Sequence, residues 1–149
     1  MVAIGTAMYA VHLLFAGLWA GGVAFVAWAI LPAAKNGTLN ARPLEAIAGK
    51  LTTLSRVSAL VLLLTGGHLA MTVYGTTALL GSRRGHLVLS MVVLWFALTG
   101  LVEVGTSRLT EGTQRDKVRS PASDSQRFFQ AAAVIGILLL VVGGVLTVR

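Results

Sequence analysis

The sequence predicts an all-α integral membrane protein, a four-helix up-down bundle with both termini outside the cytoplasm (N-out/C-out). Composition is the first observation: 56% of the 149 residues are hydrophobic and 11% are charged, less than half the charged share of an average soluble domain. The second is that four apolar segments are each long enough to cross a bilayer. The third is that most charges lie between these segments, as in membrane proteins.

The four predicted spans cover about residues 4–31, 51–74, 86–105 and 128–148. Strict alternation of apolar and polar residues, the pattern of membrane strands, is absent. The first span lacks a basic n-region and is too long for the apolar core of a signal peptide, so we expect a retained helix. The chain is therefore expected to form a single transmembrane domain over 1–149, with a polar cytoplasmic loop at 106–126.

Turn and capping residues mark the predicted ends of these helices. Pro32 fits the end of the first helix, and Asn36–Gly37 is a turn signal. Pro43 could lie in the first turn of the second helix. Ser123 and Gln126 have the spacing of a capping box ahead of the fourth span.

The distribution of Lys and Arg predicts the orientation. Four antiparallel spans place nine basic residues on the side opposite the N-terminus and three on the same side. The nine are Lys35, Arg42, Lys50, Arg56, Arg108, Arg115, Lys117, Arg119 and Arg127, and the three are Arg83, Arg84 and Arg149. The positive-inside rule assigns the richer side to the cytoplasm. We therefore expect a multi-pass protein of the cell membrane.

Three histidines are the candidate ligands, and His12, His68 and His86 all fall in the outer half of such a bundle. Met8 and Met71 lie three or four residues from His12 and His68, on the same helix faces. Imidazole with thioether suits copper. Two imidazoles on facing helices can also clamp haem b, with His12 and either His68 or His86 as axial ligands. A third interpretation is that these side chains only pack between helices.

Two charges lie inside the spans, Arg56 in the second and Glu103 in the third. They could pair across antiparallel helices, which lowers the cost of burying each. We expect a structural role for both. Trp19 is too deep for an interface anchor and shares a helix face with His12, whereas the small residues around it, including Gly21 and Gly22, predict close helix packing.

The segment from His12 to Gly22, read as H-x6-W-x-G-G, resembles the opening of the CopD copper-resistance membrane family. Arg56-Val57-Ser58 and Thr65-Gly66 are similar to that family's R-x-S and T-G positions. The resemblance covers roughly residues 8–105 and implies a multi-helix inner-membrane protein that handles copper from the outer side. The matching positions are His12, Trp19, Gly21, Gly22, Arg56, Ser58, Thr65 and Gly66.

The same opening also resembles the haem-binding membrane protoporphyrinogen oxidase family. That family continues with L-P-R and a later lysine, whereas Leu31-Pro32 is followed here by Ala33. We therefore expect no enzyme activity. Copper homeostasis is the preferred function, haem-b binding is the alternative, and a cofactor-free partner subunit is the third. The expected partners are the lipid bilayer, copper ion and a homo-oligomer or another membrane subunit, but not nucleic acid.

Overall fold

The structure is a computed structural model that describes residues 2–147. In this part of the chain four helical segments are long and apolar enough to cross a membrane. The first combines α1 (Val2–Phe25), the π-helical turn η1 (Val26–Ile30) and α2 (Leu31–Lys35), and the others are α3 (Ala41–Val73), α5 (Arg83–Thr113) and α6 (Arg119–Thr147).

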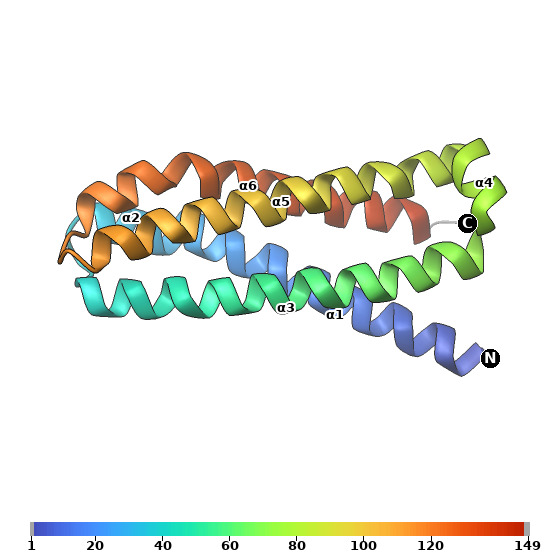
Figure 1. The fold of residues 1–149 in the computed structure, drawn as a ribbon, viewed down its shortest axis with the longest axis horizontal. Helices are drawn as coiled ribbons and strands as arrows, with labels where there is room; N and C mark the ends of the chain where they lie inside the picture. The colour runs from blue at the N-terminus through green and yellow to red at the C-terminus, as the bar shows by residue number, and fades with distance from the viewer. Residues whose placement is uncertain (1, 148–149) are drawn as a thin grey trace.

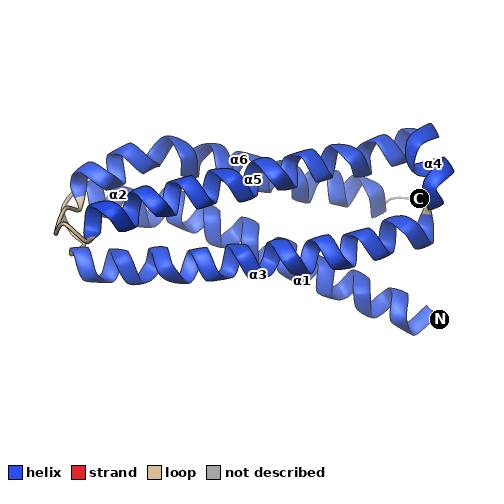
Figure 2. Cartoon of the chain, in the orientation of Figure 1, coloured by secondary structure: helices blue, strands red, loops and turns tan. Residues whose placement is uncertain are grey.

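The four long helices form one elongated up-down bundle (Figure 1, Figure 2), in which α3 packs on α1 and α5, and α6 packs on α5 and α1. The predicted all-α membrane bundle is therefore confirmed. The short helix α4 (Gly75–Gly81) joins α3 to α5 at the end that we call outer. The opposite end, with both other connections, is the one that the positive-inside rule assigns to the cytoplasm. Val148 and Arg149, which the predictions also used, lie outside the described residues.

The first helix continues through Pro32, where the sequence predicted that it ends. Pro32 lacks the backbone N–H that would bond to the preceding turn. The chain accommodates this with the wider turn η1, closed by a bond from the Leu31 N–H to the Val26 carbonyl, and α2 then packs on α6. The predicted turn at Asn36–Gly37 is present, and Gly37 has a φ of 79°, which glycine adopts without a steric cost.

The second crossing helix, α3, begins well before the predicted boundary at residue 51. Pro43 lies in its first turn, as predicted. The added turns are polar on one side but bury Leu44 and Ala48 on the other, and this packing keeps them helical. At a rise of about 1.5 Å per residue, the helix is longer than the roughly 30 Å apolar core of a bilayer. Its cytoplasmic end therefore extends beyond the lipid chains.

The predicted polar loop at 106–126 is wrong, because most of it is helical. Both α5 and α6 extend into it and leave only residues 114–118 as the connection. The two helices approach closely here: a Cβ added to Gly112 would lie 2.3 Å from the Pro121 Cβ. Burial of one face of each helix, rather than apolar composition, keeps these turns helical.

The predicted capping box at Ser123 and Gln126 is also wrong, since α6 begins at Arg119. Pro121 lies in the first turn instead. Backbone N–H groups in the first turn have no partner within the helix, so the missing N–H of proline costs no hydrogen bond there. Gln126 accepts a hydrogen bond from Lys35 Nζ at 2.5 Å. Polar side chains near the start of α6 therefore link helices rather than cap one.

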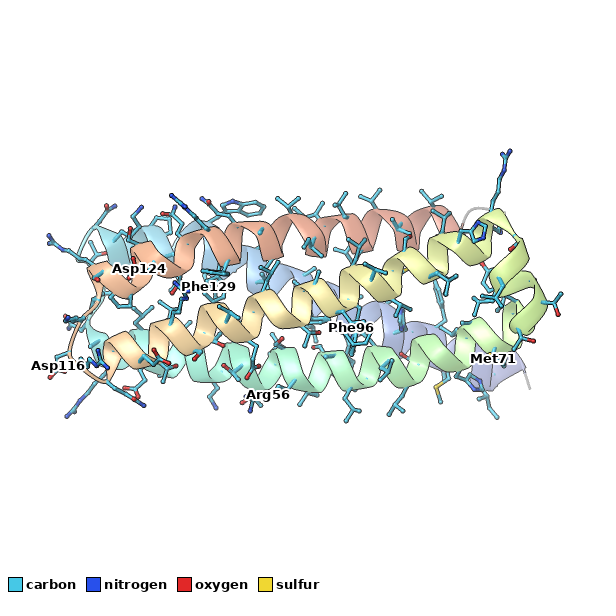
Figure 3. The ribbon with its side chains drawn as sticks, turned by 45° about the horizontal axis from the view of Figure 1, so that its top comes forward. Arg56, Met71, Phe96, Asp116, Asp124 and Phe129 are labelled. Carbon is cyan, nitrogen blue, oxygen red and sulfur yellow. The ribbon has the colours of Figure 1, made fainter. Side chains whose placement is uncertain are left out.

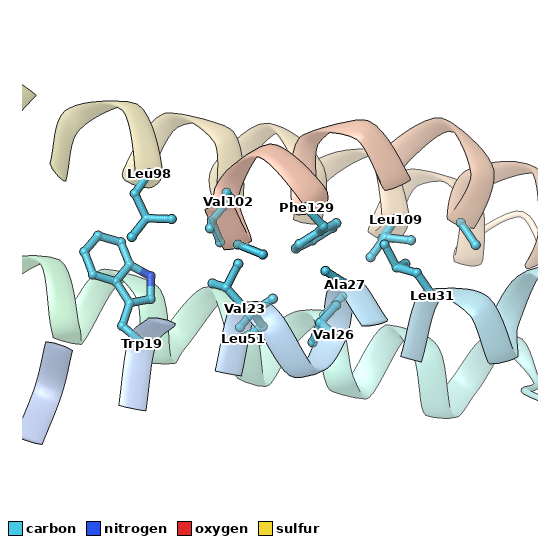
Figure 4. Close-up of a cluster of buried hydrophobic side chains, with 14 of the residues drawn as sticks. Trp19, Val23, Val26, Ala27, Leu31, Leu51, Leu98, Val102, Leu109 and Phe129 are labelled. Carbon is cyan, nitrogen blue, oxygen red and sulfur yellow. The ribbon is translucent and has the colours of Figure 1, made fainter. Parts of the chain in front are cut away.

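The buried core lies in the middle and the cytoplasmic half of the bundle. Its largest members come from all four long helices and include Trp19, Leu31, Leu44, Leu98, Leu109 and Phe129; Figure 4 shows most of this cluster. Phe129 packs so closely on α5 that a Cβ on Gly105 would lie 2.8 Å from its ring. In the outer half the N-terminal part of α1 diverges from α6 (Figure 1), so the bundle is more open there.

The outward surface of the spans is apolar. Leu64, Val93, Phe96 and Val141 are each more than half exposed. A soluble monomer rarely exposes apolar patches of this extent, whereas hydrocarbon chains solvate them without a cost. Surface and helix length together identify a multi-pass membrane protein.

Candidate functional site

The His12 imidazole, on α1, is held against α3 by a chain of two hydrogen bonds. Its Nδ1 lies 2.8 Å from the Thr65 hydroxyl oxygen, and that hydroxyl donates its proton to the Val61 carbonyl at 2.7 Å. Because the Thr65 proton is directed at Val61, the Thr65 oxygen accepts from the His12 Nδ1–H. A neutral imidazole carries a single N–H proton, so Nε2 of His12 keeps a free lone pair.

The imidazole lies directly over Gly66, the next residue of α3. A Cβ built on Gly66 would lie 2.9 Å from His12 Cε1 and 3.5 Å from Nδ1, and the first distance is well inside the optimal carbon–carbon separation of about 3.5–4.0 Å. Only glycine leaves room for the ring in this position. Thr65 therefore orients the imidazole, and Gly66 provides the space for it.

Trp19 forms a second link between α1 and α3, toward the cytoplasm. Its Nε1 donates a hydrogen bond to the Ser55 hydroxyl at 2.9 Å, and the indole is 1% exposed. Gly22 packs near α3, since a Cβ there would lie 3.0 Å from a Leu54 methyl group, whereas Gly21 faces open space. The predicted close packing therefore applies to Gly22 but not to Gly21.

Ser58 is a buried hydroxyl between these two links. It is 0% exposed, and its Oγ has no hydrogen-bond partner among residues 2–147. Ser55, Ser58 and Thr65 all lie on the buried face of α3. Ser55 was not among the predicted site residues, although its helical spacing from Ser58 places both on one face of α3 and could have revealed it.

Three of the other predicted ligands are more exposed than His12. His68 and Met71 both lie on the exposed surface of α3. His86 is exposed near the start of α5, where its Nε2 lies 3.0 Å from the Leu80 carbonyl of α4. Within the described part of the chain, no three His, Cys, Asp or Glu side chains gather as a metal-binding group. Met8 remains near His12, half-buried and one turn outward on the same helix.

Arg56 and Glu103 form the predicted ion pair between α3 and α5. Arg56 Nη2 donates to one carboxylate oxygen of Glu103, and its Nε donates to the other at 3.4 Å. Both side chains are exposed on the lateral surface of the bundle, and Figure 3 shows Arg56 on α3. Arg108, on the same helix as Glu103, lies over the Phe128 ring with its guanidinium carbon 4.7 Å from the ring centroid.

These features define a class of protein. It is a four-span membrane protein in which the imidazole of His12 is fixed between α1 and α3 in the outer half, and an ion pair between Arg56 and Glu103 lies on the surface toward the cytoplasmic end. Comparison with known families then identifies it further. The chain belongs to the CopD family, since the family model described as copper resistance protein D matches residues 45–146. The match covers α3 to α6 and does not include His12 or Trp19. It is therefore a membrane protein involved in copper resistance. No curated protein and no solved structure matched the chain.

Proposed function

We propose that the protein binds copper ion in the outer half of its bundle, with His12 Nε2 as the principal ligand. The observation that carries this proposal is the hydrogen-bond chain from His12 to Thr65 and Val61. Metal-binding histidines commonly donate their second ring N–H to a fixed acceptor, which sets both tautomer and ring orientation. The neutral ring leaves Nε2 as the donor atom for a metal.

The accessory ligand in this proposal is Met8. Its thioether lies on the same face of α1 as His12, and imidazole with thioether is a donor set suited to Cu(I). Two donors on one helix make an open site that can release its ion, as a transfer site must. His68, Met71 and His86 are exposed, and variants at these positions are tested separately.

Binding is better supported than movement through a single chain. Toward the cytoplasm from Trp19, the described helices contain no histidine, methionine or cysteine. The buried side chains there are apolar or carry hydroxyl groups, and neither type suits copper. We therefore propose a binding protein without catalytic activity, which passes copper to a partner or a second copy rather than conducting it alone.

The test is metal analysis and Cu(I) titration of the purified protein in mild detergent. We expect one copper per chain, and we expect His12→Ala to weaken binding by at least about tenfold, the lower end of the effect of losing even a supporting contact. His86→Ala, which also removes one imidazole, is the matched control and should retain binding. His68→Ala and Met71→Ala measure any accessory role.

Two outcomes would contradict the copper proposal. Unchanged copper binding by His12→Ala would exclude His12 as the principal ligand. An absorption spectrum with a Soret band that disappears in His12→Ala would establish haem b in its place. A copper-sensitive deletion strain, rescued by the wild-type chain but not by His12→Ala, would connect the site to copper resistance.

A further inference from the structure

The cytoplasmic end of the α5–α6 pair carries two adjoining hollows, at the opposite end of the bundle from His12. One has a volume of about 660 Å³ and is lined by α5, the 114–118 connection and the start of α6, and the other has a volume of about 700 Å³ and is lined mostly by α6. Arg108 and Asp124 line both hollows, so we treat them as one depression and call it the basic groove. Figure 3 shows Asp124 on α6 near this end.

Arg108 is the central cation of the basic groove. Its guanidinium lies 4.7 Å from the centroid of the Phe128 ring, and this cation–π contact orients the flat group. Arg108 forms no ion pair with any other residue that the structure describes. Its N–H donors are therefore available, and Arg127 lines the same hollow from α6.

The charges around the basic groove favour an anion. Four cations line it, namely Arg108, Arg115, Lys117 and Arg127, together with three carboxylates, namely Glu103, Glu111 and Asp124. Glu103 is already paired with Arg56, which leaves two carboxylates against four cations. Guanidinium groups match the geometry of phosphate oxygens, and Ser123 and Gln130 add neutral donors beside them.

The position of the groove points to a lipid rather than a soluble anion. Phe128 begins the apolar part of α6, and Val104 lines the groove from the membrane side. The positive-inside rule places this end in the cytoplasm, where basic pockets between transmembrane helices bind anionic headgroups. We propose that the basic groove binds the headgroup of an anionic phospholipid of the cytoplasmic leaflet, with its phosphate between Arg108 and Arg127. This site is independent of the copper proposal.

The first experiment measures phosphatidylglycerol retained on the detergent-purified protein by native mass spectrometry, with phosphatidylcholine as the neutral comparison. The variant Arg108→Gln/Arg127→Gln removes both proposed phosphate contacts. Each basic group near a lipid surface contributes about a fivefold change in affinity, so we expect a loss of roughly twenty-five-fold. The matched control, Arg42→Gln/Lys50→Gln, removes two charges from the cytoplasmic half of α3. Neither residue lines the groove, so this variant should lose much less affinity than Arg108→Gln/Arg127→Gln.

A second variant tests the groove through a gain rather than a loss. Asp124→Asn removes the carboxylate that lines both hollows, so phosphatidylglycerol should bind several-fold more tightly. Glu45→Gln, with the same change of charge on α3, should leave binding as it was. A gain also rules out general misfolding as the explanation, because a misfolded protein would not bind the lipid better.

Three results would overturn the proposal. Equal losses in the two double variants would show that the lipid responds only to the overall charge of this end. Equal effects of Asp124→Asn and Glu45→Gln would show the same. Displacement of phosphatidylglycerol by millimolar inorganic phosphate would show that the groove binds the phosphate group from any source, and not a lipid.

Discussion

At the scale of single residues, the arrangement of His12 depends on two neighbours with different roles. The Thr65 hydroxyl oxygen accepts a hydrogen bond from the His12 Nδ1–H, and Gly66 leaves the space that the ring occupies. Neither residue needs to touch a bound ion to affect binding. A change at either position therefore tests the orientation of His12 while leaving the imidazole itself in place.

Gly66→Ala should weaken copper binding by about ten- to a hundredfold, as expected for the loss of a contact that orients a ligand. The new Cβ would lie 2.9 Å from His12 Cε1, so the ring must move away from Thr65. The measurement is Cu(I) competition with a chromogenic chelator. Gly67→Ala is the control, because a Cβ there meets nothing within 4 Å. Equal behaviour of the two variants would mean that the position of the ring does not matter.

The ion pair between Arg56 and Glu103 shows how this chain keeps charges inside its spans. Each guanidinium or carboxylate alone would be costly in hydrocarbon, and pairing lowers that cost. Glu103 also lines the basic groove, and the side chains of Arg56 and Glu103 are 66% and 46% exposed. Their pairing, together with a position toward the cytoplasmic end, explains why two charges are tolerated within the predicted spans.

At the scale of elements, α5 and α6 approach each other closely in the cytoplasmic half. Gly105 faces Phe129 at the predicted membrane boundary, and Gly112 faces Pro121 beyond it, so two glycines allow the helix axes to approach closely at and beyond that boundary. The π turn before Pro32 has a comparable effect on the first helix, since it lets the chain continue past a proline and pack on α6. Both features lengthen the bundle at its cytoplasmic end.

Gly112→Ala should destabilise the protein by about 1–3 kcal/mol, the usual effect of overpacking. The added Cβ would lie 2.3 Å from the Pro121 Cβ, and a proline ring cannot rotate away. The measurement is thermal unfolding in detergent. Gly100→Ala on the same helix meets nothing within 4 Å and should be neutral or slightly stabilising, because alanine favours helices by about 1 kcal/mol over glycine. Similar unfolding temperatures for both variants would contradict the close contact.

At the scale of the whole molecule, the apolar outer surface and the uneven charge distribution define how the bundle lies in the membrane. The connections at 36–40 and 114–118 lie at one end, and α4 lies at the other. The cytoplasmic end carries the basic groove, and the outer half carries His12. Copper and anionic lipid would therefore bind on opposite sides of the bilayer.

The predicted orientation can be tested with single cysteines, because the chain has none of its own. On intact cells a membrane-impermeant maleimide should label Thr77→Cys in α4. It should label Thr38→Cys and Gln114→Cys, in the two other connections, only after the membrane is disrupted. The opposite pattern would invert the bundle and place His12 on the cytoplasmic side.

Local composition was sufficient to predict several features of this protein. The four spans and the pairing of Arg56 with Glu103 follow from which segments are apolar and where each charge lies, whereas the orientation stays a prediction. In a membrane protein these features can be predicted from the sequence, because long apolar segments and isolated charges each have few stable environments in a bilayer. The T-G pair at Thr65 and Gly66 was noted only as a resemblance, without the contact that gives it a role.

Only the tertiary structure decided which faces of the helices meet. In it, α5 and α6 extend through the expected loop at 106–126, the first helix continues past Pro32, and His12 lies against Thr65. The three histidines do not form a metal-binding group among the described residues. The physical reason is that lipid-facing and core-facing side chains are both apolar, so helical periodicity does not show how a membrane helix is rotated. That rotation depends on small residues, hydroxyls and close contacts between segments far apart in the chain.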